Sequence, residues 1–511
     1  MSPDLEPPRV GLALIKRAAI ASIAIVLLSA AAVSAAGFLQ FEGAKDDFLA
    51  AREGRPVVDV PEIDRADAGE ARTIMLIGSD LRFGDKEMGI KPRSDTIILA
   101  RLDPDKDAIT LMSIPRDFKI ENPPWGGYSD KINAAYANGG ANQVVKTVKR
   151  LLSTPEQRFE INHVVQLSFG GFRRGIDYLG CVYVDIDRRY FNDVPGVYAT
   201  IDVKPGYQKL CGKDALDYVR YRHTDNDIVR AARQQDFLRQ LKEQDAVREK
   251  LTPDNRKEIL KILGRYTDPD RGFLKTKTLL SLIKLGLFVR ENPVQEVSFG
   301  DGRLQDEGEG GLYLTASKDA IRDTVRNFLN ARTTAKPRGE LDSTDAEREA
   351  ARKTSRKRNR KASIAGLEVA RKEGEDQAII AQGKLDFPFY FPDQRVAGSR
   401  YASPEPRTYS IRDGRRKLHR SYRMVLKKGI NNEYYGIQGT TWRDPPILDG
   451  AHDTIRRNGR TLLVYYDGRR VRLVAWKTKR GVYYVHNTLL RTIDSRRMIG
   501  MAASLRRLGA N

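Results

Sequence analysis

An arginine-rich stretch just before the midpoint of the chain has the residue types that bind phosphate. It covers Tyr218–Gln235, reads YVRYRHTDNDIVRAARQQ, and contains four arginines and two aspartates. Arginine meets phosphate oxygens through two parallel N–H groups, so several arginines aimed at one point suit a doubly charged phosphate. If Val219–Arg222 is extended, the side chains of Arg220 and Arg222 point to the same face of that strand.

The second half of the stretch has the pattern of a helix over Ile228–Leu241. Asp227, Arg230 and Gln234 then share one stripe, while the apolar residues lie mostly on others. A strand end and a helix start would together direct cations and a carboxamide to one place. The alternative is a solvated helix whose charges form local ion pairs, which are common on protein surfaces and weak.

Further polar residues stand where strands are expected to begin or end. The strands are predicted over Thr73–Ile77, Ser94–Leu102, Ala108–Ile114 and His163–Leu167. A helix is predicted over Ala141–Leu152, and a hairpin turn at Asp467-Gly468. Carboxylates at strand ends can bind a divalent metal, and cations can neutralise a phosphoryl group in transfer. The sequence has no serine–histidine–carboxylate or cysteine nucleophile pattern and no Walker-type glycine loop. The polar residues concerned are Asp80, Arg93, Asp95, Arg116, Asp117, Lys131 and Asn133.

Five motifs in this order resemble the LytR-CpsA-Psr family of bacterial cell-envelope proteins. The resemblance is close over residues 72–246 and loose over residues 247–332. The last motif is the arginine-rich stretch. The other four are IGSD at Ile77–Asp80, RSDT at Arg93–Thr96, SIPRD at Ser113–Asp117 and KINAAYANGG at Lys131–Gly140.

The resemblance implies a three-layer α/β/α fold with a central mixed sheet and a hydrophobic groove for a polyprenyl chain. It also implies transfer of a glycopolymer from a polyprenyl-pyrophosphate carrier to a peptidoglycan hydroxyl, which leaves a phosphodiester link, with Mg²⁺ (or Mn²⁺) bound. A nearly all-round apolar helix expected within Lys275–Val289 is either core or a wall of that groove. Carried over by motif, Asp80 and Asp95 are the metal ligands, and the pyrophosphate is held by Arg93, Arg116, Lys131, Arg220, Arg222, Arg230 and Gln234.

The proton of the acceptor hydroxyl needs a base, and Asp95 is our choice, with Asp80 or Asp117 as alternatives. The expected catalytic set is therefore Asp95, Arg116 and Asp117. Each of several residues also has a structural interpretation. Asp117 is equally consistent with a structural ion pair, Asn133 with a helix cap, His223 with a structural hydrogen bond, and Arg233 with a solvent-facing position.

The N-terminus predicts the compartment. Ala18–Leu39 is an uncharged apolar run long enough to span a bilayer as a helix of roughly 33 Å. Arg9, Lys16 and Arg17 precede the run and acidic residues follow it, so the N-terminus is expected in the cytoplasm and the rest outside. A single-pass plasma-membrane protein in contact with membrane lipid follows, and nucleic acid is not an expected partner. A cleaved signal peptide is the alternative.

The chain of 511 residues carries 89 Lys and Arg against 67 Asp and Glu, a net charge of +22. Residues 401–511 alone contain 24 basic and 8 acidic residues, which makes them +16. We expect a cytoplasmic segment (1–17), the anchor (18–39), a tether (40–71), a catalytic domain (72–332), a charged linker (333–384) and a separate basic β-rich α+β domain (385–511). The basic domain either contacts an anionic wall polymer or lipid headgroups, or has a charged surface that serves only solubility.

Cys181 and Cys211 are the only cysteines, and the five histidines show no metal-ligand spacing. In an oxidising compartment such a pair is expected to form a disulfide, which would stabilise the fold by roughly 3 kcal/mol.

The sequence is also compatible with two other functions. A polyprenyl-pyrophosphate hydrolase would use the same phosphate-binding groups with water as the acceptor. A non-catalytic envelope-binding or sensory protein would act through the basic C-terminal residues. A cytoplasmic DNA-binding regulator conflicts with the charge asymmetry around Ala18–Leu39.

Overall fold

A computed structural model describes residues 48–52, 55, 57–67, 70–79, 92–106, 108–193, 200–221, 224, 227–250, 261, 264–272, 274, 294–297, 299, 304–308, 312–330, 364–381, 383–429, 432–468 and 470–509. Among these residues, no helix combines the length and apolar character needed to cross a bilayer. The anchor predicted at Ala18–Leu39 and the apolar helix predicted within Lys275–Val289 lie outside the described residues.

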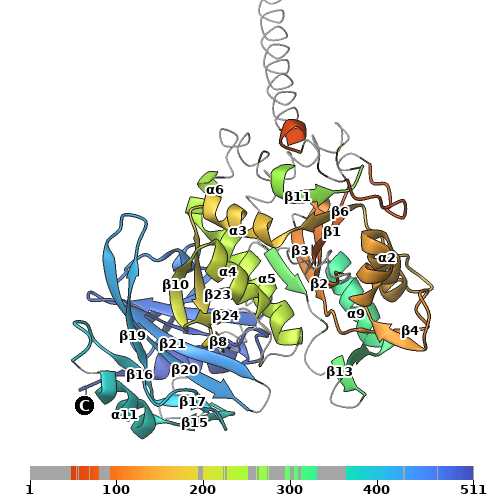
Figure 1. The fold of residues 1–511 in the computed structure, drawn as a ribbon. Coiled ribbons are helices and arrows are strands. Elements are labelled where there is room, and N and C mark those ends of the chain that lie inside the picture. Colours follow the sequence, from red (N-terminus) through yellow and green to blue (C-terminus); the bar gives the residue numbers. More distant parts are fainter. Residues whose placement is uncertain are drawn as a thin grey trace, which may run out of the picture.

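A six-stranded mixed sheet forms the centre of the N-terminal half (Figure 1). Four of its strands (β1, β3, β6 and β12) run in one direction, and the other two (β2 and β11) run against them. The strands predicted around residues 73–77, 94–102, 108–114 and 163–167 are confirmed. In spatial order, the strands are β11 (Thr267–Pro269), β6 (His163–Leu167), β1 (Arg72–Ser79), β2 (Ser94–Asp103), β3 (Ala108–Ile114) and β12 (Val294–Val297).

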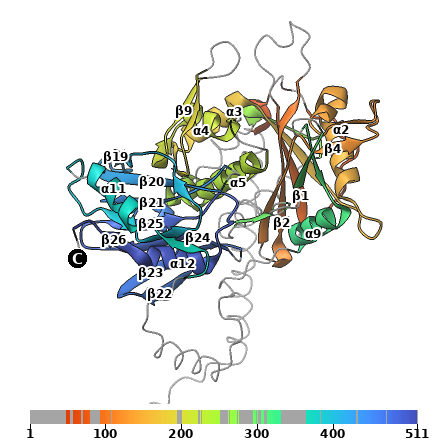
Figure 2. The ribbon, with the colours of Figure 1, turned by 90° about the horizontal axis from the view of Figure 1, so that it is seen from below.

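Helices cover both faces of this sheet, which confirms the α/β fold with a central mixed sheet (Figure 2). α2 (Ala134–Leu152) and α9 (Lys318–Leu329) pack on one face through a buried apolar cluster that includes Met75, Leu99, Val144 and Phe328. The helices on the other side are α3 (Phe169–Tyr178), α4 (Gly212–Arg220) and α5 (Asp227–Glu243).

Two local predictions differ from the structure. α2 begins at Ala134 rather than at the predicted Ala141, with a kink at Gly139 and Gly140, where Gly140 has a φ of 59° that favours glycine. The extended segment predicted at Val219–Arg222 is wrong, because α4 continues to Arg220 before Tyr221 becomes extended. The helix continues because its apolar side chains are buried at helical spacing.

The C-terminal half is a β-rich unit with helices, as predicted. Its largest sheet has the order β18 (Arg400–Tyr401), β20 (Leu418–Lys428), β21 (Glu433–Thr440), β25 (Val482–His486), β24 (Arg470–Lys477), β23 (Arg460–Asp467) and β22 (Asp453–Arg457), and β19 (Arg407–Arg412) also pairs with β20. The hairpin predicted at Asp467-Gly468 joins β23 to β24, where Gly468 has a φ of 55°.

The core of this unit includes residues before the predicted boundary at residue 385. α11 (Arg371–Ala381) and β15 (Leu367–Val369) contribute Leu367, Ala378 and Ala381 to the same apolar cluster as the large sheet. The predicted linker, 333–384, therefore overlaps this unit from residue 364 onward. The remaining elements are β16 (Tyr390–Pro392), β17 (Gln394–Val396), α12 (Ser495–Ser504) and β26 (Leu505–Arg507).

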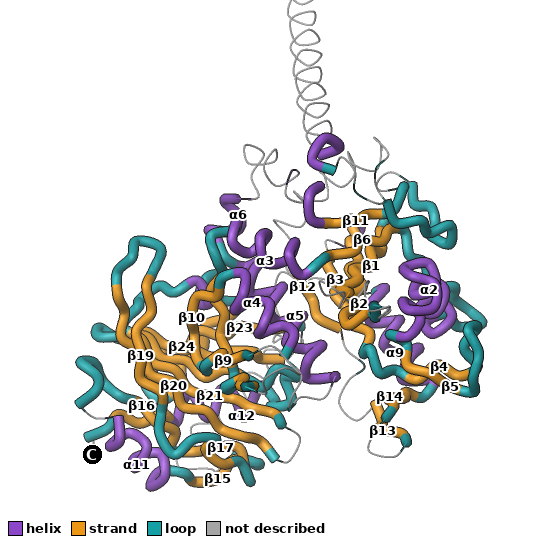
Figure 3. Tube along the Cα trace, viewed as in Figure 1, coloured by secondary structure: helices purple, strands orange, loops and turns teal. Residues whose placement is uncertain are grey.

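The C-terminal β-rich unit packs against the N-terminal half through a buried interface. Figures 2 and 3 show α5 between the central sheet and the large C-terminal sheet. β7 (Val182–Ile186) and β10 (Gly206–Leu210) also belong to this contact. Tyr183 and Tyr207 pack with Trp442 in one apolar cluster. An aromatic cluster shared between the halves excludes water from their contact.

A buried ion pair crosses the same interface. Arg423 on β20 donates to Asp185 on β7, with 3.0 Å between Nη1 and Oδ1. Burial raises the pKa of Asp185 from 3.8 to about 6, although Arg423 opposes this change. His486 lies 4.0 Å from the same carboxylate, and burial lowers its pKa below 6.5.

The raised pKa of Asp185 predicts a pH-dependent contribution to stability. Because the folded state binds this proton more tightly, the stabilisation is complete below about pH 4 and is lost as the pH rises through about 6. The stability of the wild type relative to Asp185→Asn should therefore fall by about 2 kcal/mol between about pH 4.5 and about pH 7. Urea unfolding at both pH values measures this difference, and a constant difference would contradict the account.

Candidate active site

The central sheet brings the predicted polar residues to one of its edges. Because β1, β3, β6 and β12 are parallel to one another, their carboxyl ends meet at that edge, and β2 begins there. Ligands bind at the carboxyl ends of strands in many open α/β sheets. Arg116 and Asp117 follow β3, Arg93 precedes β2, and Asp95 is its second residue. Asp80 and Arg222 lie outside the described residues.

The backbone at Asp95 is irregular. Gly78 pairs with Thr96 and Ser79 pairs with Ser94, so Asp95 is the extra residue of a β-bulge between β1 and β2. Bulges often occur next to active sites, where they change the direction of a side chain. Because Ser79 is the last residue of β1, this register places Asp95 beside the end of the neighbouring strand. The side chain of Asp95 itself lies outside the described residues.

Arg116, Asp117 and Lys131 are in direct contact. Lys131 Nζ lies 2.9 Å from Asp117 Oδ1, and Arg116 Nη2 lies 3.5 Å from Asp117 Oδ2. Arg116 is buried, and its carbonyl accepts a hydrogen bond from Asn133 N at 3.2 Å. Asp117 therefore orients two cations, which supports its structural interpretation and makes it a poor candidate for the base. Asn133 occupies the N-cap position of α2 but makes no side-chain cap bond.

α5 is tied to the same edge by a carboxamide. Gln234 Nε2 donates to Thr96 Oγ1 at 3.2 Å and to Val219 O at 3.1 Å, which joins α5 to β2 and to the end of α4. Arg230 precedes Gln234 by about one turn of α5 and is also buried. The structure thus places the α5 residues beside Thr96, the neighbour of Asp95.

Arg220 is the last residue of α4 and contacts the segment that follows β6. Its guanidinium carbon lies 3.9 Å from the centre of the Phe169 ring, and Phe169 begins α3 directly after β6. Arg93, in contrast, is exposed at the start of β2. Except for residues outside the described part, the predicted phosphate-binding residues therefore gather around the carboxyl ends of β1, β3 and β6.

The prediction that Arg233 faces solvent is wrong. Its exposed fraction is 0%, and its guanidinium carbon lies 4.6 Å from the centre of the Tyr190 ring. Arg233 also donates to the Tyr221 carbonyl. Arg188, which we did not single out from the sequence, also packs on the Tyr190 ring, with its guanidinium carbon 4.5 Å from the ring centre. Both guanidiniums therefore make cation–π contacts with the Tyr190 ring.

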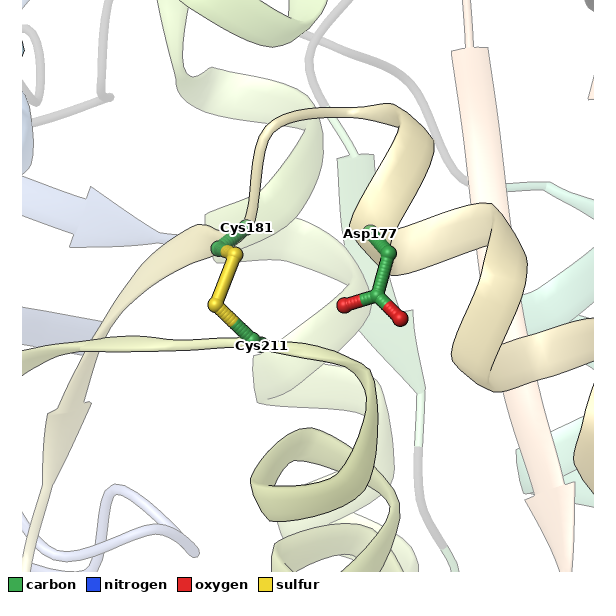
Figure 4. Close-up of side chains that lie close together, drawn as sticks. All are labelled: Asp177, Cys181 and Cys211. Atoms are coloured by element: carbon green, nitrogen blue, oxygen red, sulfur yellow. A yellow bond between two sulfur atoms is a disulfide. The ribbon is translucent and has the colours of Figure 1, made fainter.

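The predicted disulfide between Cys181 and Cys211 is present, with the Cα atoms 4.4 Å apart (Figure 4). It joins the end of the α3 turn to the start of α4. Asp177 lies beside it, and its Oδ1 accepts a hydrogen bond from Gly212 N at 2.7 Å. Although Asp177 and the two cysteines form a compact cluster, the bonded sulfurs provide no thiolates for a metal.

Replacing both cysteines by serine should lower the free energy of unfolding by roughly 3 kcal/mol, because it frees a loop of 30 residues in the unfolded chain. Equilibrium denaturation under non-reducing conditions measures this loss. A difference below about 1 kcal/mol would contradict a stabilising role.

A model of the LytR_cpsA_psr family matches residues 43–327, more than half of the chain. The chain therefore belongs to the LytR-CpsA-Psr family. A Bacillus subtilis protein named polyisoprenyl-teichoic acid–peptidoglycan teichoic acid transferase TagT is 30% identical to it over 220 residues, which cover 42% of this chain and 66% of that protein. TagU of Oceanobacillus iheyensis, with the same descriptive name, is 33% identical over 220 residues, 42% of this chain and 62% of that protein.

These matches span less than two thirds of either relative. Among solved structures, that of Bacillus subtilis TagT aligns at 22% identity with a TM-score of 0.38, covering 54% of this chain and 98% of that chain.

Proposed function

We propose that this protein transfers a glycopolymer from a polyprenyl-pyrophosphate carrier to a hydroxyl of peptidoglycan. The contact of Lys131, Asp117 and Arg116 beside the bulge at Asp95 carries this proposal. In this contact, Asp117 orients two cations that belong to the family motifs SIPRD and KINAAYANGG. The family membership and the names of the relatives support the choice of donor and acceptor.

Charge neutralisation is the main requirement of this reaction. The acceptor oxygen attacks the phosphorus that bears the saccharide, and the bond from this phosphorus to the oxygen bridging the two phosphates breaks, so polyprenyl phosphate leaves. Preorganised N–H donors in a partly dry site stabilise the charge that develops on both phosphates. Arg116, Lys131, Arg220 and Arg230 would supply these donors, and Gln234 would hold α5 against β2.

A divalent cation fits the carboxylates at the bulge. Mg²⁺ or Mn²⁺ would be held by Asp80 and Asp95 and would offset charge on the pyrophosphate. The register between β1 and β2 supports this assignment, since it brings the end of one strand next to Asp95. A carboxylate that binds a metal is a weak base. A group other than a metal ligand would therefore have to take the proton from the acceptor hydroxyl.

The carrier's polyprenyl chain would follow the sheet face opposite α2 and α9. Ile74, Leu102 and Ile109 form an apolar cluster on that face, against which Leu76 and Val165 pack. We propose a membrane-anchored protein that works outside the cell, as the charge pattern around residues 18–39 indicates.

A release assay tests the proposal with the full chain in detergent and a polyprenyl-pyrophosphoryl saccharide. Polyprenyl phosphate release should rise on addition of peptidoglycan fragments, stop after chelation of divalent ions and recover with Mg²⁺. Asp95→Asn should abolish the release. Release that is indifferent to the acceptor would favour a hydrolase, and binding of the donor without release would favour a non-catalytic protein.

A further inference from the structure

A groove of about 850 Å³ lies between the β4–β5 hairpin, the end of α2 and the start of α9. β4 is Lys119–Glu121 and β5 is Ser129–Lys131. The short hairpin of β13 (Leu304–Glu307) and β14 (Tyr313–Ala316) completes its wall. Its volume is typical of cavities that hold an organic ligand.

Two contacts link the lining of the groove to the candidate active site. Lys119, which lines the groove, is the cross-strand partner of Lys131, which contacts Asp117. Directly paired residues of antiparallel strands lie roughly 5 Å apart and share one face. The carbonyl of Asp117 also accepts a hydrogen bond from Leu314 N at 2.9 Å, and the next residue, Thr315, lines the groove.

The chemistry of the groove differs from that of the phosphate-binding residues. Four basic and three acidic side chains line it, and Lys119 contacts Glu307 directly, so its charges are nearly balanced. Apolar side chains such as Phe118 and Ile321 alternate with hydroxyl groups, which can both donate and accept hydrogen bonds. The hydroxyl-bearing lining residues are Thr147, Ser153, Thr154, Thr315 and Ser317.

A balanced surface of this kind does not attract a polyanion over a neutral polymer. A saccharide chain with acetamido groups and short peptides has many hydroxyl and amide groups, small apolar faces and charges of both signs. This is the chemistry of the proposed acceptor, and Lys119 in the lining is paired across the hairpin with Lys131, one of the cations that would hold the reacting phosphates.

We infer that this groove binds the acceptor, a peptidoglycan strand of amino sugars carrying short peptides, and directs one of its hydroxyls to the site of Arg116, Asp117 and Lys131. This inference rests on the proposed function. It assigns to β4, α2 and α9 a role in acceptor recognition, separate from the donor-binding residues on α4 and α5.

Lys318 is a suitable position for substitutions that test this inference. It is the first residue of α9, is exposed, and lines the groove. Lys318→Trp fills part of the groove, and Lys318→Glu changes its charge balance. Glutamate in the first turn interacts favourably with the helix dipole, so the second variant should fold at least as well as the wild type. Lys372→Trp is the matched control, because Lys372 is exposed in the first turn of α11, outside the groove.

Transfer kinetics should show an acceptor KM about 10-fold higher in Lys318→Trp, equivalent to about 1.4 kcal/mol. The donor KM and the acceptor-independent release should not change, and Lys372→Trp should match the wild type. An unchanged acceptor KM in both Lys318 variants overturns the inference. A raised donor KM with an unchanged acceptor KM also overturns it, since it assigns the groove to the donor saccharide.

Calorimetric binding of a disaccharide–peptide fragment separates this inference from the proposed function. If the wild type binds the fragment and Lys318→Trp binds it about 10-fold more weakly, the groove is the acceptor site even if no turnover is found. Equal binding by the two proteins overturns the groove assignment even if transfer occurs.

Discussion

Replacing Arg116 by glutamine is expected to lower the turnover of glycopolymer transfer by about 10²–10³-fold. Arg116 is buried at the end of β3 and is held by Asp117, which also holds Lys131. A preorganised cation at this position would stabilise charge that develops in the transition state, so its loss should appear mainly in kcat. Glutamine keeps much of the side-chain volume and a hydrogen-bond donor. Single-turnover release of polyprenyl phosphate at saturating donor measures the effect.

Arg101 provides the control for this variant. It lies on β2 near the opposite edge of the same sheet and pairs with Asp103 at 3.3 Å. Arg101→Gln also removes a sheet-edge arginine from an ion pair, but it should leave turnover within about 2-fold of the wild type. Equal losses of turnover in the two variants would indicate a general effect on the sheet and would contradict a catalytic role for Arg116.

Replacing Arg491 by glutamine is expected to lower the free energy of unfolding by about 3–5 kcal/mol. Arg491 lies between β25 and α12 and is bound to two carboxylates, 2.6 Å from Asp236 Oδ1 and 3.2 Å from Asp467 Oδ2. Asp236 belongs to α5 and is also buried. Removing Arg491 leaves buried carboxylates without one of their cationic partners. This lowers the free energy of unfolding far more than the loss of a surface ion pair does.

The loss should also depend on pH. Although burial acts in the opposite direction, Arg239 and Arg491 lower the pKa of Asp236 below its ordinary value of 3.8. A carboxylate with a lowered pKa stabilises the fold above that ordinary value and loses this contribution as the pH falls. The destabilisation by Arg491→Gln should therefore be largest near neutral pH and smaller in acid. Urea unfolding over this range measures it.

Arg189→Gln is the matched control for this second variant. Arg189 pairs with Asp202 at 2.7 Å, but both side chains are well exposed. Its loss should cost no more than about 1 kcal/mol. A similar cost for Arg491→Gln would show that the interface between the two halves does not depend on its buried charges.

The central sheet could be predicted because its strands are apolar runs that end in turn residues. The stretches around residues 94–103 and 108–114 are rich in apolar residues. The turn residues Pro104-Asp105-Lys106-Asp107 join them. The polar residues at the strand ends followed from the same pattern. Parallel strands then bring these ends to one edge, which explains why Arg116 and the bulge at Asp95 lie together.

The docking of the C-terminal half could not be predicted in this way. Asp236, Arg239 and Glu243 have the i, i+3 and i+7 spacing of a solvated helix face, and Arg239 does pair with both acids. The two acids have further partners more than 200 positions along the chain, where Arg472 contacts Glu243 and Arg491 contacts Asp236. Helical spacing shows which charges share a stripe, but it does not show what covers that stripe.

The errors at Arg220 and Arg233 have a related cause. The YVRYR segment alternates in polarity as a strand does, yet Tyr218 is buried within α4, and the helix continues past it. Arg233 carries a charge, but the rings of Tyr190, Tyr218 and Tyr221 surround its guanidinium. A local sequence pattern predicts that an arginine is exposed to solvent, because it does not show which aromatic rings cover the side chain in the fold.

The mass of the acceptor after the reaction tests the central claim most directly. The full chain would be incubated with Mg²⁺, a polyprenyl-pyrophosphoryl saccharide and a defined peptidoglycan fragment, and the fragment would be analysed by mass spectrometry. Our account predicts that the fragment gains the saccharide together with one phosphate, joined as a phosphodiester, while polyprenyl phosphate is released. A fragment that gains the saccharide without phosphate, or free saccharide phosphate with an unchanged fragment, would contradict it.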